Sequence, residues 1–273
     1  MKRRLLGPLS VALLALAWAA GPALADQLEP RYPDARQLVA TARCYSPQQK
    51  VHLEDALGKA LNAKVSADTL SHLTVLAMSR GVPADHLVVF YQILLRVRAG
   101  GLPDLPFAGK MAEGMAKGAP SDLIIQVVLE KERNFLRARQ LMSANIERKL
   151  LYNDSYYRLL DLTAEALRRG LPPQGLELVL HAGDSLDEIG RGVATYLYLQ
   201  AIGFPSDVAP DIIVAALQAD QLNDCRTCLG QVVLTAKRAG APPRKVRDDL
   251  VRGLKSGRNL GELSRVLYQA PVK

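Results

Sequence analysis

The chain has 273 residues, 49% of them hydrophobic, and a formal net charge of +8, which suits one or two globular domains or one continuous helical array. The surplus of positive charge is too small for the electrostatic footprint of a nucleic-acid-binding protein, so we expect no nucleic-acid partner. The single tryptophan, Trp18, lies within the first 25 residues, which have the pattern of a cleaved signal peptide. Its loss would remove the indole platform that sugar-stacking or base-stacking modules often use.

The first 25 residues have the pattern of a secretory signal peptide. Three cations within the first four residues precede an apolar run at 11–20, and a small-residue site of the Ala-x-Ala kind ends at Ala25. The run is shorter than a membrane-spanning helix, which argues against a retained membrane anchor. We therefore expect residues 1–25 to be removed during export, leaving residues 26–273 as a single α-helical repeat domain that is periplasmic or extracellular. Losing the three cations of the leader lowers the formal charge from +8 to +5.

Six Gly-x-Pro triplets punctuate the rest of the chain. In each, glycine suits the left-handed conformation that follows the end of a helix, and proline suits the start of the next helix. We therefore expect six helix-to-helix corners. Several are 33 to 37 residues apart, the length of a paired-helix repeat, although the interval from Gly118 to Gly170 is longer. The triplets are Gly81-Val82-Pro83, Gly101-Leu102-Pro103, Gly118-Ala119-Pro120, Gly170-Leu171-Pro172, Gly203-Phe204-Pro205 and Gly240-Ala241-Pro242.

One earlier segment, Lys64-Val65-Ser66, has a similar form, with Ser66 as a helix cap in the place of proline. We expect another corner there.

A small residue also lies four positions before most of the triplet glycines, for example Gly114 before Gly118, and would let a neighbouring helix approach closely. Leu199, four positions before Gly203, departs from this rule.

The segments between the corners carry apolar residues at three- and four-residue steps, which is the helical period, and none has the alternation of a strand. The run from Ser121 to Leu151 contains no helix breaker and is predicted to form one long helix or two. The chain is therefore predicted to be all-α, with antiparallel helix pairs joined at Gly-x-Pro corners. Such pairs would form a solenoid-like array or a compact helical bundle.

The stretch EGMAKGAPSDLIIQVVLEKERNFLRARQLM, from Glu113 to Met142, resembles the repeats of uncharacterised exported bacterial α-helical proteins. The units of that family run Glu-Gly-Leu-x-Lys-Gly-Val-Pro, followed by a helix start and a Leu- and Arg-rich helix. The other corners match the pattern more loosely. The resemblance implies export and helical repeats, and it brings neither an activity nor a site residue with it.

The cysteines suggest a disulfide or a redox pair. The motif Cys225-Arg226-Thr227-Cys228 would place both sulfurs in the first turns of a helix, where the pKa of a thiol is lowered. No βαβ pattern of the thioredoxin kind surrounds it, and an oxidising compartment favours a structural disulfide. A bond from Cys44 to either cysteine would tie the two ends of the array together. The pairing stays open, as do a free or intermolecular thiol and thiol exchange.

The segment from Lys237 to Arg258 carries a formal charge of +6, more than the whole surplus of the exported chain. It offers a candidate surface for an acidic partner, an anionic lipid or a cell-wall polymer. A solvated helix face is the plainer interpretation of such a charge run. The cations of this segment are Lys237, Arg238, Arg244, Lys245, Arg247, Arg252, Lys255 and Arg258.

The sequence contains no recognisable catalytic or cofactor motif, and its scattered histidines lack the spacing of metal ligands. We therefore expect no catalytic residue, no cofactor and no metal. Because helical arrays present long surfaces, the leading hypothesis is a non-catalytic binding or scaffold protein with a protein partner in the cell envelope. The alternatives are a thiol-active envelope protein using Cys225 and Cys228, and a binder of anionic envelope surfaces through residues 237–258.

Overall fold

The computed structural model describes residues 34–146, 154–222 and 226–268, and within these ranges the chain forms thirteen α-helices and no strand. This confirms the all-α prediction. The predicted leader lies outside the described residues. The odd-numbered helices are α1 (Ala35–Thr41), α3 (Ala67–Ser79), α5 (Leu105–Ala116), α7 (Asp154–Arg168), α9 (Leu186–Ala201), α11 (Arg226–Arg238) and α13 (Leu260–Tyr268). The even-numbered helices are α2 (Pro47–Asn62), α4 (Ala84–Ala99), α6 (Ser121–Asn145), α8 (Pro173–Ala182), α10 (Ala209–Gln218) and α12 (Pro243–Lys255).

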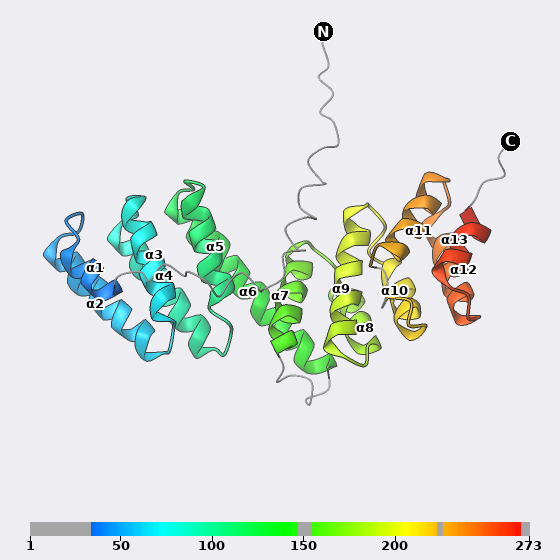
Figure 1. Cartoon of the computed structure of the whole chain (residues 1–273), viewed down its shortest axis with the longest axis horizontal. Helices are drawn as coiled ribbons and strands as arrows, with labels where there is room; N and C mark the ends of the chain where they lie inside the picture. The colour runs from blue at the N-terminus through cyan, green and yellow to red at the C-terminus, as the bar shows by residue number, and fades with distance from the viewer. Residues whose placement is uncertain (1–33, 147–153, 223–225, 269–273) are drawn as a thin grey trace, which may run out of the picture.

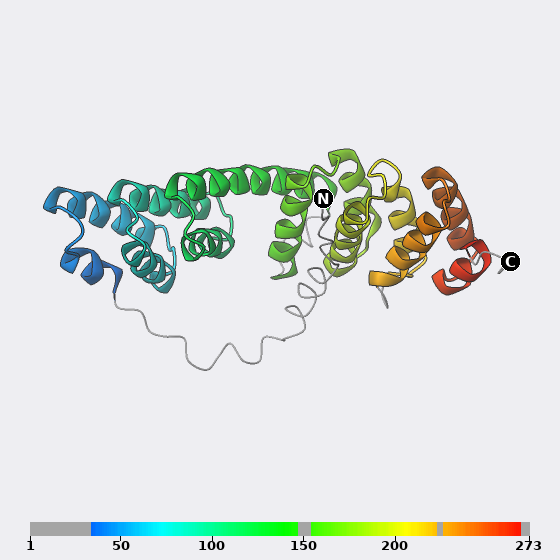
Figure 2. The same cartoon turned by 90° about the horizontal axis from the view of Figure 1, so that it is seen from above.

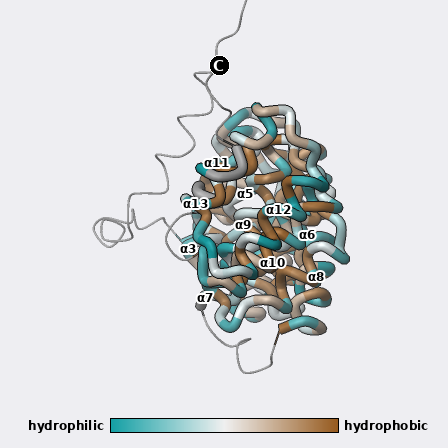
Figure 3. Tube along the Cα trace, turned by 90° about the vertical axis from the view of Figure 1, so that its right-hand side faces the viewer, coloured by the Kyte–Doolittle hydropathy of each residue, from teal (hydrophilic) through white to brown (hydrophobic). Residues whose placement is uncertain are grey.

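The helices form an elongated, solenoid-like array of two layers rather than a compact bundle (Figure 1). The even-numbered helices pack on one another in order from α2 to α12 and make one layer, which we call the even layer. The odd-numbered helices make the other layer, the odd layer. An end-on view shows α6 and α8 on one side and α7, α11 and α13 on the other (Figure 3). The buried apolar residues form one core cluster, which reaches from Val39 in α1 to Leu263 in α13.

The corners at the Gly-x-Pro triplets have the geometry of helix C-terminal caps. Gly81 has a φ of +65°, and the N–H of Val82 donates to the carbonyl of Ala77 over 2.9 Å. This bond closes a helix in the left-handed conformation, which glycine adopts without steric cost. Val82 and Leu87 are both buried beside the turn, as a hydrophobic staple requires. The other glycines with φ between +70° and +80° are Gly101, Gly118, Gly170, Gly203, Gly240 and Gly257.

The prolines lie one position earlier than predicted. In four triplets the proline is the N-cap with an extended backbone, so it precedes the first helical residue rather than being that residue. Its ring fixes φ near the value found there, and its carbonyl accepts the first bond of the new helix. The N–H of Leu87, for example, donates to the carbonyl of Pro83 over 3.1 Å. The four N-cap prolines are Pro83, Pro120, Pro172 and Pro242, and Pro205 lies further from its helix, which begins at Ala209.

The corner predicted at Lys64 forms without glycine or proline. Lys64 has a φ of +64°, and the N–H of Val65 donates to the carbonyl of Ala60 over 3.1 Å. The Oγ of Ser66 accepts the N–H of Thr69 and caps α3. A lysine in the left-handed conformation costs about 1–2 kcal/mol relative to glycine. This cost is offset by the cap and by the burial of Val65.

The odd layer is interrupted between α5 and α7, and the long helix α6 bridges the break (Figure 2). Helix α6 has 25 residues, whereas the other even helices have 16 or fewer. Helix α5 packs on α3 and α6, and α7 packs on α6 and α9. The break accounts for the long interval from Gly118 to Gly170. The long helix predicted from Ser121 ends at Asn145 within the described residues.

Side chains also link neighbouring repeats. Arg96 of α4 and Glu132 of α6 form a bidentate pair with N–O distances of 2.7 and 2.6 Å. The Nζ of Lys237 donates to the carbonyl of Ile202, at the end of α9, over 2.6 Å. Carbonyl groups at a helix end have no intrahelical partner. Such contacts therefore complete one repeat with a side chain from the next.

Candidate binding surfaces

The exposed apolar side chains of the array concentrate on the even layer. Of the seven large hydrophobic side chains that are exposed in the described residues, five lie on α2, α6 and α8. These five are Val51, Leu123, Val127, Leu136 and Leu178, whereas Leu105 lies on α5 and Tyr157 on α7. Val127 lines the cleft between α5 and α7, whereas Val51, Leu123, Leu136 and Leu178 are exposed elsewhere on the even layer.

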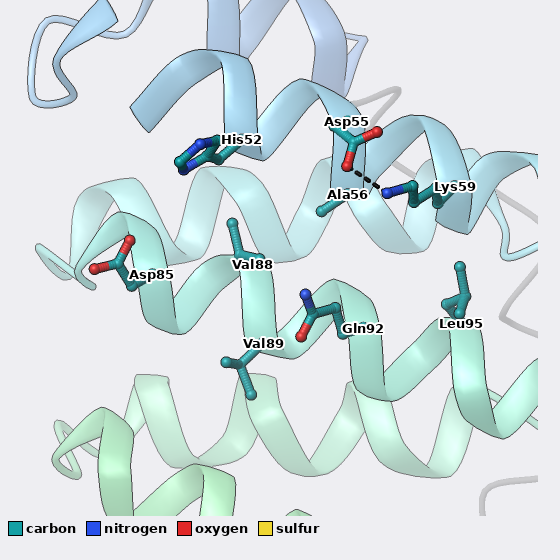
Figure 4. A pocket seen from close by; sticks show the side chains of 9 residues that line it. All are labelled: His52, Asp55, Ala56, Lys59, Asp85, Val88, Val89, Gln92 and Leu95. Carbon is teal, nitrogen blue, oxygen red and sulfur yellow. Dashed lines mark hydrogen bonds and ion pairs between the residues drawn. The ribbon is translucent and has the colours of Figure 1, made fainter. Parts of the chain in front are cut away.

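A shallow furrow of about 370 Å³ lies between α2 and α4, and we call it the N-terminal furrow (Figure 4). Asp55 and Lys59 form an ion pair of 2.6 Å along α2, and Asp85 lies on α4. The charged groups of this furrow are therefore two acids and one lysine. Its apolar lining comes from Ala56, Val88, Val89 and Leu95.

A larger furrow of about 600 Å³ lies between α10 and α12, with Leu178 of α8 at its edge. We call it the C-terminal furrow. Its apolar lining continues with Val214 and Ala215 of α10 and Val251 of α12. The side chain of Leu178 is 52% exposed. An exposed leucine beside a recessed apolar floor is a typical feature of a surface that binds another protein.

The charges of the C-terminal furrow are divided between its two ends. Toward the start of α12, Arg247 lies 2.8 Å from Asp248 and 3.6 Å from Asp211 of α10. Toward the end of α12, Arg252 and Lys255 line the furrow and form no ion pair with any described residue. At one end two acids share a single arginine, whereas the other end keeps two unpaired cations.

The predicted basic segment is not one uniform face. Lys237 binds the Ile202 carbonyl, Lys245 pairs with Asp249 at 2.6 Å, and Arg247 has the contacts given above. These three cations have partners within the array. The other five are exposed and form no ion pair within the described part of the chain: Arg238, Arg244, Arg252, Lys255 and Arg258.

Charge is strongly segregated over the last repeats. Residues 171–222 hold seven acidic residues and one arginine, whereas residues 226–265 hold ten cations and three acidic residues. The first block includes α8 to α10 and the second includes α11 and α12. The C-terminal furrow lies on the boundary between them. The formal charge of the whole chain conceals this contrast because the two blocks largely cancel.

The cysteines lie far apart in the array. Cys44 is exposed and follows α1, and it forms no disulfide with a described residue. Helix α11, which begins one residue after Cys225, lies toward the opposite end (Figure 1). An elongated array does not bring these two regions together, so an intramolecular bond from Cys44 to the Cys225–Cys228 motif is incompatible with this arrangement. Cys225 and the side chain of Cys228 lie outside the described residues, and a bond between them stays a prediction.

A contact that sequence analysis missed joins α4 to the start of α6. The Nδ1 of His86 lies 2.6 Å from the Oγ of Ser121, and its Nε2 lies 3.3 Å from the Oδ1 of Asp122. In a catalytic triad a buried carboxylate orients the histidine. Here the side chain of Asp122 is 78% exposed, and the three residues line neither furrow. We interpret the contact as a link between repeats at a helix N-terminus, where the dipole favours an acid.

The break in the odd layer leaves a cleft of about 380 Å³ over the middle of α6. Lys131 of α6 pairs with Asp161 of α7 at 3.0 Å, and its Nζ lies 4.8 Å from the centre of the Phe135 ring. On the α7 side, hydrogen bonds from Arg168 and Arg169 lower the pKa of the Glu165 carboxyl to about 2. These charged groups satisfy one another, so the cleft offers a partner fewer unpaired charges than the C-terminal furrow does.

No protein-family model, curated protein or solved structure matches the chain. None of the helices in the described ranges has the length and apolar character needed to cross a membrane. The same part of the chain contains no group of three His, Cys, Asp or Glu side chains placed to hold a metal ion.

Proposed function

We propose that this chain is an exported, non-catalytic helical-repeat scaffold that binds a protein partner in the cell envelope. The observation that carries the proposal is the concentration of exposed apolar side chains on the helices of the even layer. A two-layer array folds by burying its inner faces, so side chains that stay exposed are not needed for the core. Contiguous apolar groups with a polar rim are a feature of protein-binding surfaces. The leader pattern supports a partner outside the cytoplasm.

Affinity co-purification from cross-linked envelope extract tests the proposal, with the tagged chain 26–273 as bait. A variant with Val51→Glu, Leu123→Glu and Leu178→Glu changes three exposed apolar residues of the even layer. We expect a protein that the wild-type chain retains and this variant loses, while the helical circular dichroism of the two chains stays the same. The matched control is Leu105→Glu with Tyr157→Glu, which changes exposed apolar residues of the odd layer.

The outcomes separate the alternatives. A partner retained equally by all three chains would contradict the role of the even layer, and the absence of any partner would contradict the scaffold proposal. A Cys225→Ser/Cys228→Ser variant run beside them tests the thiol-active alternative. Partners trapped only when both cysteines are present would favour thiol chemistry.

A second candidate function is attachment to an anionic lipid or a cell-wall polymer through the terminal repeat. The five unpaired cations of the basic segment favour it. Attraction of this kind weakens as ionic strength rises. Co-sedimentation with phosphatidylglycerol vesicles, compared with phosphatidylcholine vesicles, measures it directly. We expect Arg238→Glu with Arg258→Glu to abolish binding if this function is correct, and salt-independent binding would contradict it.

A further inference from the structure

We infer, on the basis of the scaffold function proposed above, that the C-terminal furrow is a docking site for an acidic amphipathic helix of the partner protein. Three features of the described residues lead to this partner. The furrow has an apolar floor, it has two unpaired cations at one end, and its counterpart near the other end of the array has the opposite balance of charge.

The apolar lining of the furrow comes from three helices. Leu178, Val214 and Val251 are 36 and 37 residues apart, which is one repeat in each case, and they lie on successive even helices. The buried residue Ala215 keeps the floor low between them. A helix packing its ridges into a groove between two other helices needs apolar residues at three- and four-residue steps to fill it. The first requirement on the partner is therefore an amphipathic helix.

The unpaired cations determine the charge of that helix. Arg252 and Lys255 line the furrow and are exposed, and side chains of this kind can lay their stems on apolar surface while their charged ends stay in water. Carboxylates beside the apolar stripe of the partner would pair with them. At the other end, Asp211 and Asp248 outnumber Arg247. We therefore expect the acids of the partner to cluster over the end of α12 and to be absent over its start.

Two other occupants fit less well. A second copy of the chain related by a two-fold axis would bring Arg252 and Lys255 toward their own counterparts, so that like charges would meet. A lipid surface would attract the unpaired cations, but a flat surface makes no use of a recessed apolar floor. An acidic amphipathic helix uses both the floor and the cations.

The N-terminal furrow is a control contained in the same molecule. It occupies the equivalent place between two even helices and also has an apolar lining, but its charges are Asp55, Asp85 and a Lys59 that is already paired. An acidic helix would meet net repulsion there. We therefore expect one site for an acidic helix in each chain.

The probe for the test is a fluorescein-labelled helical peptide with leucines at three- and four-residue steps and glutamates on both flanks. The chain 26–273 is titrated into it and fluorescence anisotropy gives the Kd. We expect Leu178→Glu, and separately Arg252→Glu with Lys255→Glu, to weaken binding about tenfold or more. Arg238→Glu with Arg258→Glu reverses the same amount of charge outside the furrow, and we expect it to weaken binding less than about threefold. All of the substituted residues are exposed, and melting curves verify that each variant folds.

Several results would overturn the inference. Equal weakening by the two charge-reversal pairs would mean diffuse attraction to the basic repeat, as for an anionic surface. Equal binding of a scrambled peptide of the same composition would exclude a role for the apolar floor, and no binding of the peptide would exclude the site. A dimer in sedimentation equilibrium that Leu178→Glu dissociates would make a second copy the occupant. If co-purification with Leu178→Glu/Arg252→Glu still retains a protein partner, the scaffold proposal stands and this docking site fails.

Discussion

The two furrows of the even layer occupy equivalent places near opposite ends of the array, yet they differ in charge. Each lies between successive even helices and has an apolar floor. The N-terminal furrow holds two acids and a paired lysine, whereas the C-terminal furrow keeps Arg252 and Lys255 unpaired. The fold depends on inner faces, caps and corners, which both ends share. The side chains of the outer faces do not pack in the core, so their charge and polarity can differ from one repeat to the next.

The largest contrast we expect between the helices of the two furrows concerns their glycines. A Cβ at Gly253 of α12 would lie 2.2 Å from a methyl carbon of Leu263, whereas a Cβ at Gly58 of α2 would meet nothing within 4 Å. Gly253→Ala should lower the free energy of unfolding by about 1–3 kcal/mol through overpacking. Gly58→Ala should raise it by up to about 1 kcal/mol through helix propensity. Urea unfolding measures both, and equal stability of the two variants would mean that α13 does not pack closely on α12.

Ion pairs across the even layer give the second contrast. Glu132 is 8% exposed and holds Arg96 with two hydrogen bonds, whereas the carboxylates around Arg247 are half exposed. Arg96→Ala would leave a buried carboxylate without its partner, and we expect the free energy of unfolding to fall by about 1–3 kcal/mol. Arg247→Ala should leave it unchanged within error because exposed pairs contribute little.

A double variant checks the cause of that loss. Adding Glu132→Gln to Arg96→Ala removes the unpaired charge and should recover part of the stability. A double variant less stable than Arg96→Ala alone would show that the loss comes from packing of the arginine stem.

Two corners provide a smaller contrast of opposite sign. Gly240 between α11 and α12 has a φ of +75° with open space around it, and Lys64 after α2 has a φ of +64°. Gly240→Ala should lower the free energy of unfolding by about 1 kcal/mol through backbone strain, and Lys64→Gly should raise it by about 0.5–1 kcal/mol by relieving the same strain. Thermal melting followed by circular dichroism detects both changes, and a destabilising Lys64→Gly would mean that the lysine side chain itself supports the corner.

The smallest effect we expect is a pH dependence shared by the two halves of the array. Hydrogen bonds from Lys110 and Lys117 lower the pKa of Glu113 to about 2, and those from Arg168 and Arg169 lower that of Glu165 to about 2. Because both pKa values lie below the value of 4.5 for a free glutamate, the stabilisation is full above pH 4.5 and is lost as pH falls toward 2. Glu165→Gln should flatten the decline of stability over this range. An unchanged decline would exclude a contribution from this pair.

Much of the fold could be predicted because the chemistry of a helix corner is local. A Gly-x-Pro triplet contains both halves of a corner, and Ser66 performs the task of the proline after Lys64. The corners at Asp220 and Gly257 escaped prediction because no proline follows them. Gly257 is followed by Asn259, whose Oδ1 accepts the N–H of Glu262 and caps α13, so a wider set of capping residues would have found that corner.

The candidate site was harder to predict because its members are one repeat apart. In the sequence each member is one more apolar residue at a helical spacing. Only the packing of α8, α10 and α12 shows that Leu178, Val214 and Val251 line the same furrow. The basic segment was visible in the sequence. Which of its cations remain unpaired depends on groups from earlier repeats, such as Asp211 and the carbonyl of Ile202.

The break between α5 and α7 also determines how the molecule bends. A beam of two bonded layers is stiff because bending must compress one layer while it stretches the other. Between α5 and α7 the odd layer lacks this packing, and the two halves are joined through the contacts that each of these helices makes with α6. We therefore expect bending of the array to concentrate at α6. Such bending would change the distance between the two furrows and leave the shape of each furrow unchanged. A partner that contacted both furrows would therefore have to tolerate a variable distance between them.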